Sequence, residues 1–173
     1  MRTVILFLAL LFTTNIYAIN FKASYLTPKD MELLKQIKSY GDEYNLSYSL
    51  MAIAVKESSI GRFKINVDSF DYGLYQANIN TVIRRHQMKN SNSNRNKVAM
   101  MLINDFDFAT SNAIAELVYW KKIHKGNWTK IWGSYNAGWN FDSTRGQKYS
   151  KDIIKIIKEL KKVDVLNNKE INS

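Results

Sequence analysis

The sequence predicts a single α-rich domain. Apolar side chains recur at intervals of three and four residues along most of the chain, and strand-like alternation is almost absent. Residues that break helices are scarce, with one proline and seven glycines in 173 residues. The length suits one ordinary domain, and a hydrophobic fraction of 46% is enough to fill a buried core.

The first 18 residues have the pattern of a secretory signal. Arg2 supplies the positive charge, and an uninterrupted apolar run over residues 4–12 is too short to cross a bilayer comfortably as a helix. Ala18 provides a small residue before a cleavage point. We therefore expect export to the periplasm, or secretion, with removal of residues 1–18. An uncleaved membrane anchor is the alternative.

An N-terminal helical segment is expected over residues 19–45. Thr27 before Pro28 is typical of a helix start, because the hydroxyl can cap the first turn and the proline lacks an N–H that this turn does not need. Gly41 is expected to weaken or end this helix.

The second predicted helix is capped by Ser47 and stops near Gly61. One of its faces carries residues spaced i, i+3, i+4 and i+7, namely Leu50, Ile53, Ala54 and Glu57. A carboxyl group held against apolar side chains keeps its proton near neutral pH, because burial disfavours the charged form. Glu57 is therefore a candidate proton donor.

Five more helices are predicted from apolar spacing. They cover residues 74–86, residues 97–103, a stretch from Thr110 or Ser111 to Lys121, residues 128–135 and residues 149–162. Residues 89–96 are rich in Asn, Ser and Lys, and they predict an exposed loop, as do residues 138–146. The polar tail over residues 163–173 is expected to fray.

Composition excludes several kinds of site. The chain has no cysteine, so disulfides, thiolate metal sites and thiol nucleophiles are excluded. His86 and His124 stand in no metal-ligand spacing, and we expect them at the surface or the edge of the core. We expect no metal and no cofactor.

The formal net charge of +10 suits either solubility or attraction to polyanions, such as nucleic acid, anionic lipid or acidic wall polymers. The basic residues look scattered rather than gathered in one arm, so we expect no nucleic-acid partner. The lysines of the last helix are expected to form a solvated outer face. No stable membrane span is expected once the signal is removed.

Two short motifs follow Glu57 along the chain. In Gly73-Leu74-Tyr75-Gln76, the glycine lets backbone approach a ligand, the tyrosine adds a flat face for a sugar ring, and Gln76 offers a donor and an acceptor. A helix start with a core tyrosine is the alternative. In Tyr135-Asn136-Ala137-Gly138, the tyrosine hydroxyl can orient a carboxyl group and Asn136 can bind an acetamido group. Three nearby tryptophans could stack sugars or form an aromatic core turn: Trp128, Trp132 and Trp139.

The order of Glu57-Ser58 and these two motifs resembles the soluble lytic transglycosylase family of lysozyme-like muramidases, over roughly residues 46–149. Asn112 with Tyr119 resembles the family's helix that bears an Asn and a substrate-side Tyr, and Tyr149 resembles the tyrosine that opens its final helix. Tyr75 and Ala77 depart from the family's common Met or Phe and Ile, in ways that look tolerable.

The resemblance implies a lysozyme-like α fold over residues 46–162 that cleaves the β-1,4 bond between N-acetylmuramic acid and N-acetylglucosamine in peptidoglycan. Glu57 would act as acid and then as base, leaving a 1,6-anhydro end. The substrate would be bound by Ser58, Gly73, Tyr75, Gln76, Asn78, Tyr119, Tyr135 and Asn136. Short size and a signal look most like the small members that open the wall locally for secretion, conjugation or pilus machines.

Two other functions stay open. Asp71 lies 14 positions after Glu57, in a run that resembles the loop of animal-type lysozymes bearing their second carboxylate. Water-dependent hydrolysis by Glu57 and Asp71 is therefore one alternative. A turn or helix-cap role is the other interpretation of Asp71. A non-catalytic glycan-binding assembly factor that keeps the fold is the second alternative.

Overall fold

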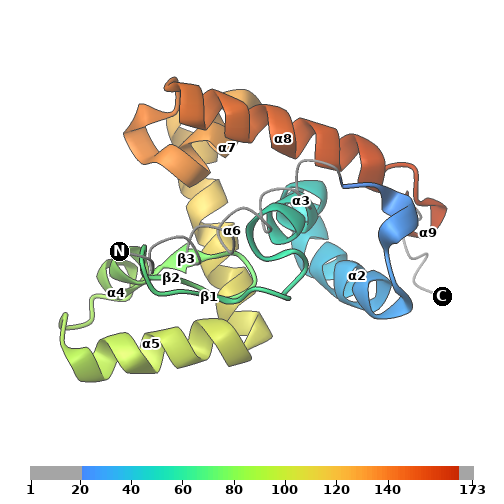
Figure 1. The fold of residues 1–173 in the computed structure, drawn as a ribbon. Helices are drawn as coiled ribbons and strands as arrows, with labels where there is room; N and C mark the ends of the chain where they lie inside the picture. Colours follow the sequence, from blue (N-terminus) through green and yellow to red (C-terminus); the bar gives the residue numbers. More distant parts are fainter. Residues whose placement is uncertain (1–20, 168–173) are drawn as a thin grey trace, which may run out of the picture.

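In the computed structural model, residues 21–167 are described, and most of them are helical (Figure 1). This confirms the predicted α-rich class, whereas the signal predicted over residues 1–18 lies outside the described residues. Two short 3-10 helices are present, η1 (Ala23–Tyr25) and η2 (Gly138–Asn140). The α-helices are α2 (Pro28–Asp42), α3 (Ser47–Ser58), α4 (Ile79–Arg85), α5 (Asn92–Asn104), α6 (Phe106–Ile123), α7 (Trp128–Ala137), α8 (Thr144–Leu160) and α9 (Asp164–Asn167).

A small antiparallel sheet, which the sequence analysis did not predict, lies between α3 and α4. Its strands are β1 (Ile65–Asn66), β2 (Asp71–Tyr72) and β3 (Ala77–Asn78), in the order β1-β2-β3. Each strand is two residues long, so a period-two pattern has no length over which to appear. The helix predicted from residue 74 begins only at Ile79, where the Asn78 side chain accepts a hydrogen bond from the Asn80 N–H at 3.1 Å.

The predicted start of α2 is confirmed. The Thr27 hydroxyl accepts a hydrogen bond from the Asp30 N–H, and the Asp30 carboxylate accepts one from the Thr27 N–H. Ser47 is the first residue of α3 and not its cap, because its hydroxyl donates to Asp42. Gly41 lies one residue before the end of α2, and a Cβ there would come within 2.6 Å of the Ser47 Cα.

Three helices begin earlier than their apolar spacing indicates. α5 begins at Asn92, α6 at Phe106 and α8 at Thr144, each behind a polar residue whose side chain accepts a hydrogen bond from a first-turn N–H: Ser91, Asp105 and Ser143. The predictions of loops over residues 89–96 and 138–146 are therefore wrong over much of their length. The first turns of α5 and α8 are polar, so they carry capping chemistry but no apolar periodicity, whereas the first turn of α6 contains Phe106 and Phe108.

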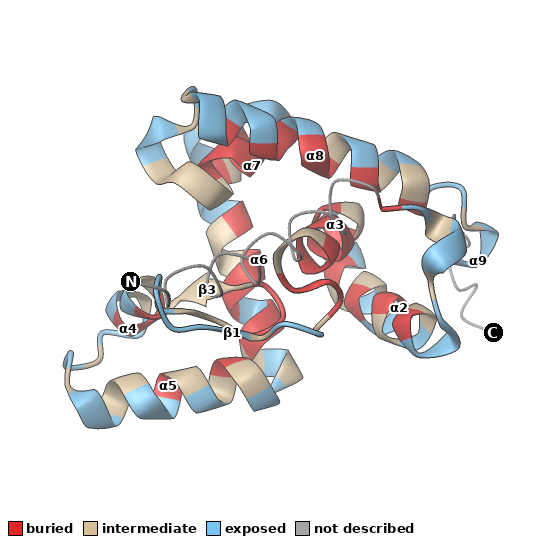
Figure 2. Ribbon diagram, viewed as in Figure 1, coloured by how far each residue is buried: buried red, intermediate tan, exposed pale blue. Residues whose placement is uncertain are grey.

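Two hydrophobic clusters hold the fold together. The large core is built around α3, whose residues 50–55 are all fully buried, and is completed by α2, α6, α7 and α8 (Figure 2). The small core has five buried residues from α4 and α5: Ile79, Val82, Ile83, Val98 and Leu102. No helix in residues 21–167 is both long enough and apolar enough to cross a bilayer.

The start of the C-terminal tail is ordered rather than frayed. Leu166 of α9 is fully buried in the large core, and the Tyr48 hydroxyl donates to its carbonyl at 3.2 Å. This helix is only four residues long, which is too short for apolar residues to recur at helical spacing, so the sequence analysis missed it.

Candidate active site

A cavity of about 280 Å³ is lined by residues of the large-core helices, the sheet and α4. It brings Glu57 together with the sequence-predicted Asp71, Gln76, Asn78, Tyr135 and Asn136. Its other lining residues are Ser69, Ala77, Thr81, Val82, Arg85, Asn112, Glu116 and Arg145.

Glu57 stands in the last turn of α3 with a partly buried side chain. Burial raises the pKa of its carboxyl group to about 7, and the negative charge of Asp71 acts in the same direction. The Tyr149 hydroxyl and the charges of Lys56 and Arg145 oppose the rise in pKa. Both protonation states of Glu57 are therefore populated near neutral pH.

The Tyr149 hydroxyl is the second notable group beside Glu57. It is buried, and among the described residues no atom meets hydrogen-bond geometry with it. It nevertheless interacts with the Glu57 carboxyl, because each group shifts the pKa of the other. The Glu57 carboxyl is therefore the group beside which this buried hydroxyl is placed.

A left-handed turn follows α3, directly after Glu57 and Ser58. Ser59, Ile60 and Gly61 all have positive φ, of 51°, 60° and 80°. For a β-branched residue such as Ile60 this conformation is strained. The buried Ser58 hydroxyl stabilises the turn by accepting a hydrogen bond from the Gly61 N–H at 2.8 Å and donating to the Leu74 carbonyl at 2.7 Å.

Three of the predicted binding residues lie in the interior instead of at the cavity. Ser58 is fully buried, and its hydroxyl is occupied by the turn described above. Gly73 has φ +83°, and a Cβ there would come within 2.1 Å of the Leu102 carbonyl oxygen, so this glycine admits the backbone of α5 rather than a ligand. Tyr75 is 1% exposed and its hydroxyl lies 3.3 Å from that of Thr110, which matches the core-tyrosine alternative.

Tyr119 does not line the cavity either. It is 47% exposed on α6, and the edge of its ring contacts Trp120. The two histidines lie at the surface or the edge of the core, as expected, and neither lines the cavity: His86 stacks on Phe108, and His124 contacts the Ser134 hydroxyl at 2.7 Å.

The sheet supplies one side of the cavity. Asp71 and Asn78 pair across β2 and β3, and the Asn78 amide donates to the Asp71 carboxylate at 2.9 Å and to the Ser69 carbonyl at 3.0 Å. Asp71 is thus a strand residue facing the cavity, and not a turn or cap aspartate. The Gln76 amide donates to the Gly73 carbonyl at 3.0 Å, which fixes its side chain at the cavity.

The end of α7 supplies the opposite side. The Tyr135 hydroxyl donates to the Tyr75 carbonyl at 3.1 Å, so it joins the two sequence motifs instead of orienting Glu57 directly. The Asn136 side-chain oxygen accepts a hydrogen bond from Arg145 of α8 at 2.8 Å. Tyr149, one helical turn after Arg145, is the hydroxyl that faces Glu57.

A polar network on α6 was predicted only in part, because the sequence analysis singled out Asn112 but not Arg85, Glu116 or Trp120. Arg85 forms an ion pair with Glu116 and donates to the Asn112 side-chain oxygen at 3.1 Å. The Trp120 indole donates to the other Glu116 oxygen at 2.6 Å. Asn112, Glu116 and Trp120 are spaced four residues apart, so polar groups at helical spacing within an apolar helix were the available signal.

The described residues hold no group of three or more His, Asp or Glu side chains arranged to bind a metal ion. The groups that line the cavity include the Glu57 carboxyl with its raised pKa, the Tyr135 phenol and several side-chain amides.

Comparison with known proteins matches residues 35–157 to the family described as "Transglycosylase SLT domain". This range includes Glu57 and every residue that lines the cavity. A protein of Enterobacteria phage T4, described as "Uncharacterized 20.7 kDa protein in vs-regB intergenic region", is 32% identical over 127 residues, which cover 71% of this chain and 68% of that protein. No solved structure matches.

Proposed function

Because this chain belongs to the transglycosylase SLT family, we propose that it is a lytic transglycosylase that cleaves the β-1,4 bond between N-acetylmuramic acid and N-acetylglucosamine in peptidoglycan. The observation that carries the proposal is the Glu57 carboxyl group, which lines the cavity with a pKa of about 7. A single group can act first as acid and then as base only when its pKa lies near the working pH.

In the proposed reaction, protonated Glu57 donates its proton to the glycosidic oxygen as the bond from that oxygen to C1 of the muramic acid breaks. The carbonyl oxygen of the substrate's own N-acetyl group stabilises the positive charge at C1. The Glu57 carboxylate then removes the proton from the C6 hydroxyl, and that oxygen bonds to C1. The products are a free N-acetylglucosamine end and a 1,6-anhydro end, Glu57 is protonated again, and no water is consumed.

Neighbouring residues support each step. The Tyr149 hydroxyl, which interacts with the Glu57 carboxyl, can donate to the carboxylate once the first proton has left, which stabilises the ionised form before the second transfer. The fixed amides of Gln76, Asn78 and Asn136 offer donors and acceptors of the kind that acetamido and hydroxyl groups require.

One observation favours a second candidate. Asp71 lines the same cavity, and its charge contributes to the raised pKa of Glu57. A carboxylate in that place could activate water or stabilise the cationic sugar, and the enzyme would then be a hydrolytic lysozyme.

The products separate these functions. Sacculi digested with the purified protein should yield muropeptides with 1,6-anhydro ends, detected by mass spectrometry. Digestion with the Glu57→Gln variant is the negative control. Reducing muramic ends that gain oxygen from ¹⁸O-labelled water would overturn the transglycosylase proposal in favour of hydrolysis. If the natural protein leaves the sacculi undigested, and it and Glu57→Gln bind them equally, a glycan-binding assembly factor would be favoured.

We place this activity in the periplasm because residues 1–18 have the pattern of an export signal. Local wall opening for a secretion, conjugation or pilus machine is the proposed role, supported by the exported pattern of residues 1–18. Fractionation of the tagged protein tests the location, since cytoplasmic retention of the full chain would contradict it.

A further inference from the structure

The outer face of α8 carries a row of four lysines. Lys148, Lys151, Lys155 and Lys158 are spaced by three, four and three residues, so they share one side of the helix, and all four are exposed. The row is about 15 Å long at 1.5 Å per residue. Within residues 21–167, no acidic side chain forms an ion pair with any of the four.

The acidic residues of α8 are directed elsewhere. Asp152 is buried and forms an ion pair with Lys56 of α3 at 2.9 Å. Glu159 pairs with Lys162 and also accepts a hydrogen bond from the Ala23 N–H at 3.4 Å. Neither carboxylate offsets the lysine row. Like charges at these spacings destabilise a helix slightly, so an ordinary solvated face would normally mix the two signs.

The positive charge of the whole chain is also concentrated near α8. Residues 121–162 contain eleven lysines and arginines and three acidic residues, a net charge of +8 out of +10 for the chain. The interpretation of the basic residues as scattered is therefore corrected: most of the excess positive charge lies in the part of the chain that ends with α8.

The shape around the row decides which polyanion it fits. α8 lies along one edge of the molecule, on the opposite side from α5 (Figure 1). Its apolar side packs inward, with Ile153, Ile156 and Leu160 buried, and no lysine of the row lines the cavity at Glu57 or either of two further hollows of the described residues. The lysine row is thus a ridge and not a groove.

A flexible anionic strand is bound most effectively in a positively charged groove with aromatic side chains. A ridge of lysines without large exposed apolar side chains instead matches a flat anionic surface, which all four charges can approach together. We propose that the lysine row docks this protein peripherally on bilayers that contain anionic phospholipid. This inference is independent of the proposed catalytic reaction.

Vesicle binding of the full chain tests the proposal. We expect binding to phosphatidylcholine vesicles to increase when phosphatidylglycerol is added and to weaken with salt. The variant Lys148→Gln/Lys151→Gln/Lys155→Gln/Lys158→Gln should bind the anionic vesicles on the order of 1000-fold more weakly. Vesicles of phosphatidylcholine alone report any contribution of the apolar residues 4–12.

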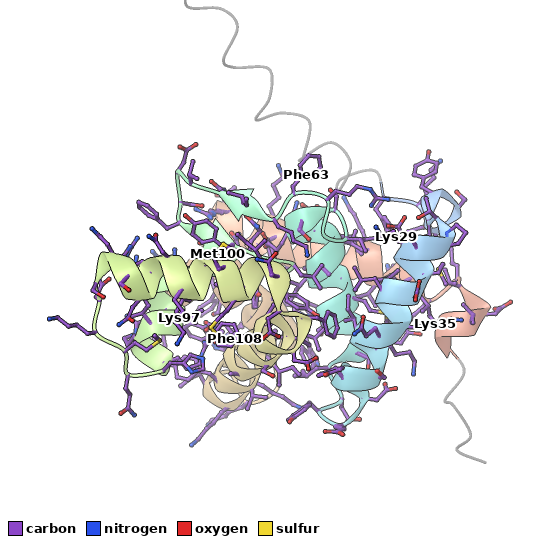
Figure 3. All side chains as sticks on the ribbon, turned by 90° about the horizontal axis from the view of Figure 1, so that it is seen from below. Lys29, Lys35, Phe63, Lys97, Met100 and Phe108 are labelled. Carbon is purple, nitrogen blue, oxygen red and sulfur yellow. The ribbon has the colours of Figure 1, made fainter. Side chains whose placement is uncertain are left out.

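A matched control removes the same charge from the other side of the molecule. Lys29, Lys35 and Lys97 lie on the α2–α5 side (Figure 3), and they are exposed, as is Lys89. Changing these four to Gln should weaken vesicle binding by less than about threefold, because charges away from the docked face are screened by salt. Four Lys→Arg changes in the row, which keep the charge, should preserve binding.

Three results would overturn the proposal. The first is an equal loss of vesicle binding in the two variants with four Lys→Gln changes, which would show that binding depends on net charge alone. The second is binding to anionic vesicles no tighter than to neutral ones. The third is row-dependent binding to soluble single-stranded DNA or heparin without binding to vesicles, which would assign the row to a strand-like polyanion. Circular dichroism and thermal melts establish that each variant is folded.

Discussion

The two sides of the cavity rest on cores of very different size. Glu57 and Tyr149 stand on α3 and α8 of the large core, where residues 50–55 are fully buried. Asp71 and Asn78 stand on two-residue strands beside the small core of five residues. The large-core side removes water from a carboxyl group and raises its pKa, whereas the small-core side presents polar groups that already bond one another. We call the side of the cavity on α3 and α8 the deep side and the side on β2 and β3 the shallow side. We infer that proton transfer depends on the deep side, whereas substrate contacts depend more on the shallow side.

The largest effect should come from the deep side. Glu57→Gln keeps the size of the side chain but removes its proton, so the rate of muropeptide release should fall by on the order of 10³-fold. Binding to sacculi should remain, because the polar groups of the shallow side are untouched. A variant that retains more than about a tenth of the activity would remove Glu57 from the reaction.

Matched core truncations test the difference in size. Leu50 of the large core and Leu102 of the small core are both almost fully buried. We expect Leu50→Ala to lower the free energy of unfolding by about 3–5 kcal/mol and Leu102→Ala by about 2–3 kcal/mol, measured by urea denaturation. Hydrogen exchange should then increase mainly in α4 and α5 for Leu102→Ala. Equal losses with exchange throughout the chain would show that the two cores act as one.

The raised pKa of Glu57 also makes stability depend on pH. Folding favours the neutral carboxyl, so its stabilising contribution is complete below pH 4.5 and is lost as pH rises through about 7. Glu57→Gln stays neutral, so its stability relative to the natural protein should improve between pH 4.5 and pH 8, by about 2–3 kcal/mol. Thermal melts across this range measure the change. Glu32→Gln, on the exposed side of α2, removes the same charge and is the matched control.

The smallest effect is expected on the shallow side. Asp71→Asn keeps an oxygen that can accept from Asn78, so kcat/KM should fall less than about tenfold and the products should keep anhydro ends. A loss as large as that of Glu57→Gln would make Asp71 an equal partner and favour the hydrolytic alternative.

Much of the deep side could be predicted from local spacing. The i, i+3, i+4, i+7 pattern placed Glu57 on a helix with a buried apolar face, and α3 has that form. The motif at residues 135–138 was also predicted to contribute to the site, and part of it lines the cavity. The shallow side could not be predicted in the same way, because β2 and β3 are too short for a periodic pattern and the Arg85–Glu116 pair joins residues 31 positions apart.

The sequence alone determined the α-rich class, the helical face of Glu57 and the excess of positive charge, since each depends on residue types and spacing within a few turns. Tertiary structure decided which motif residues reach the cavity. The left-handed turn at residues 59–61 buries Ser58, and contact with Leu102 requires a glycine at position 73. Tertiary structure also decided that Asp152 pairs inward with Lys56 and leaves the lysine row uncompensated, because such pairings depend on which distant elements pack together.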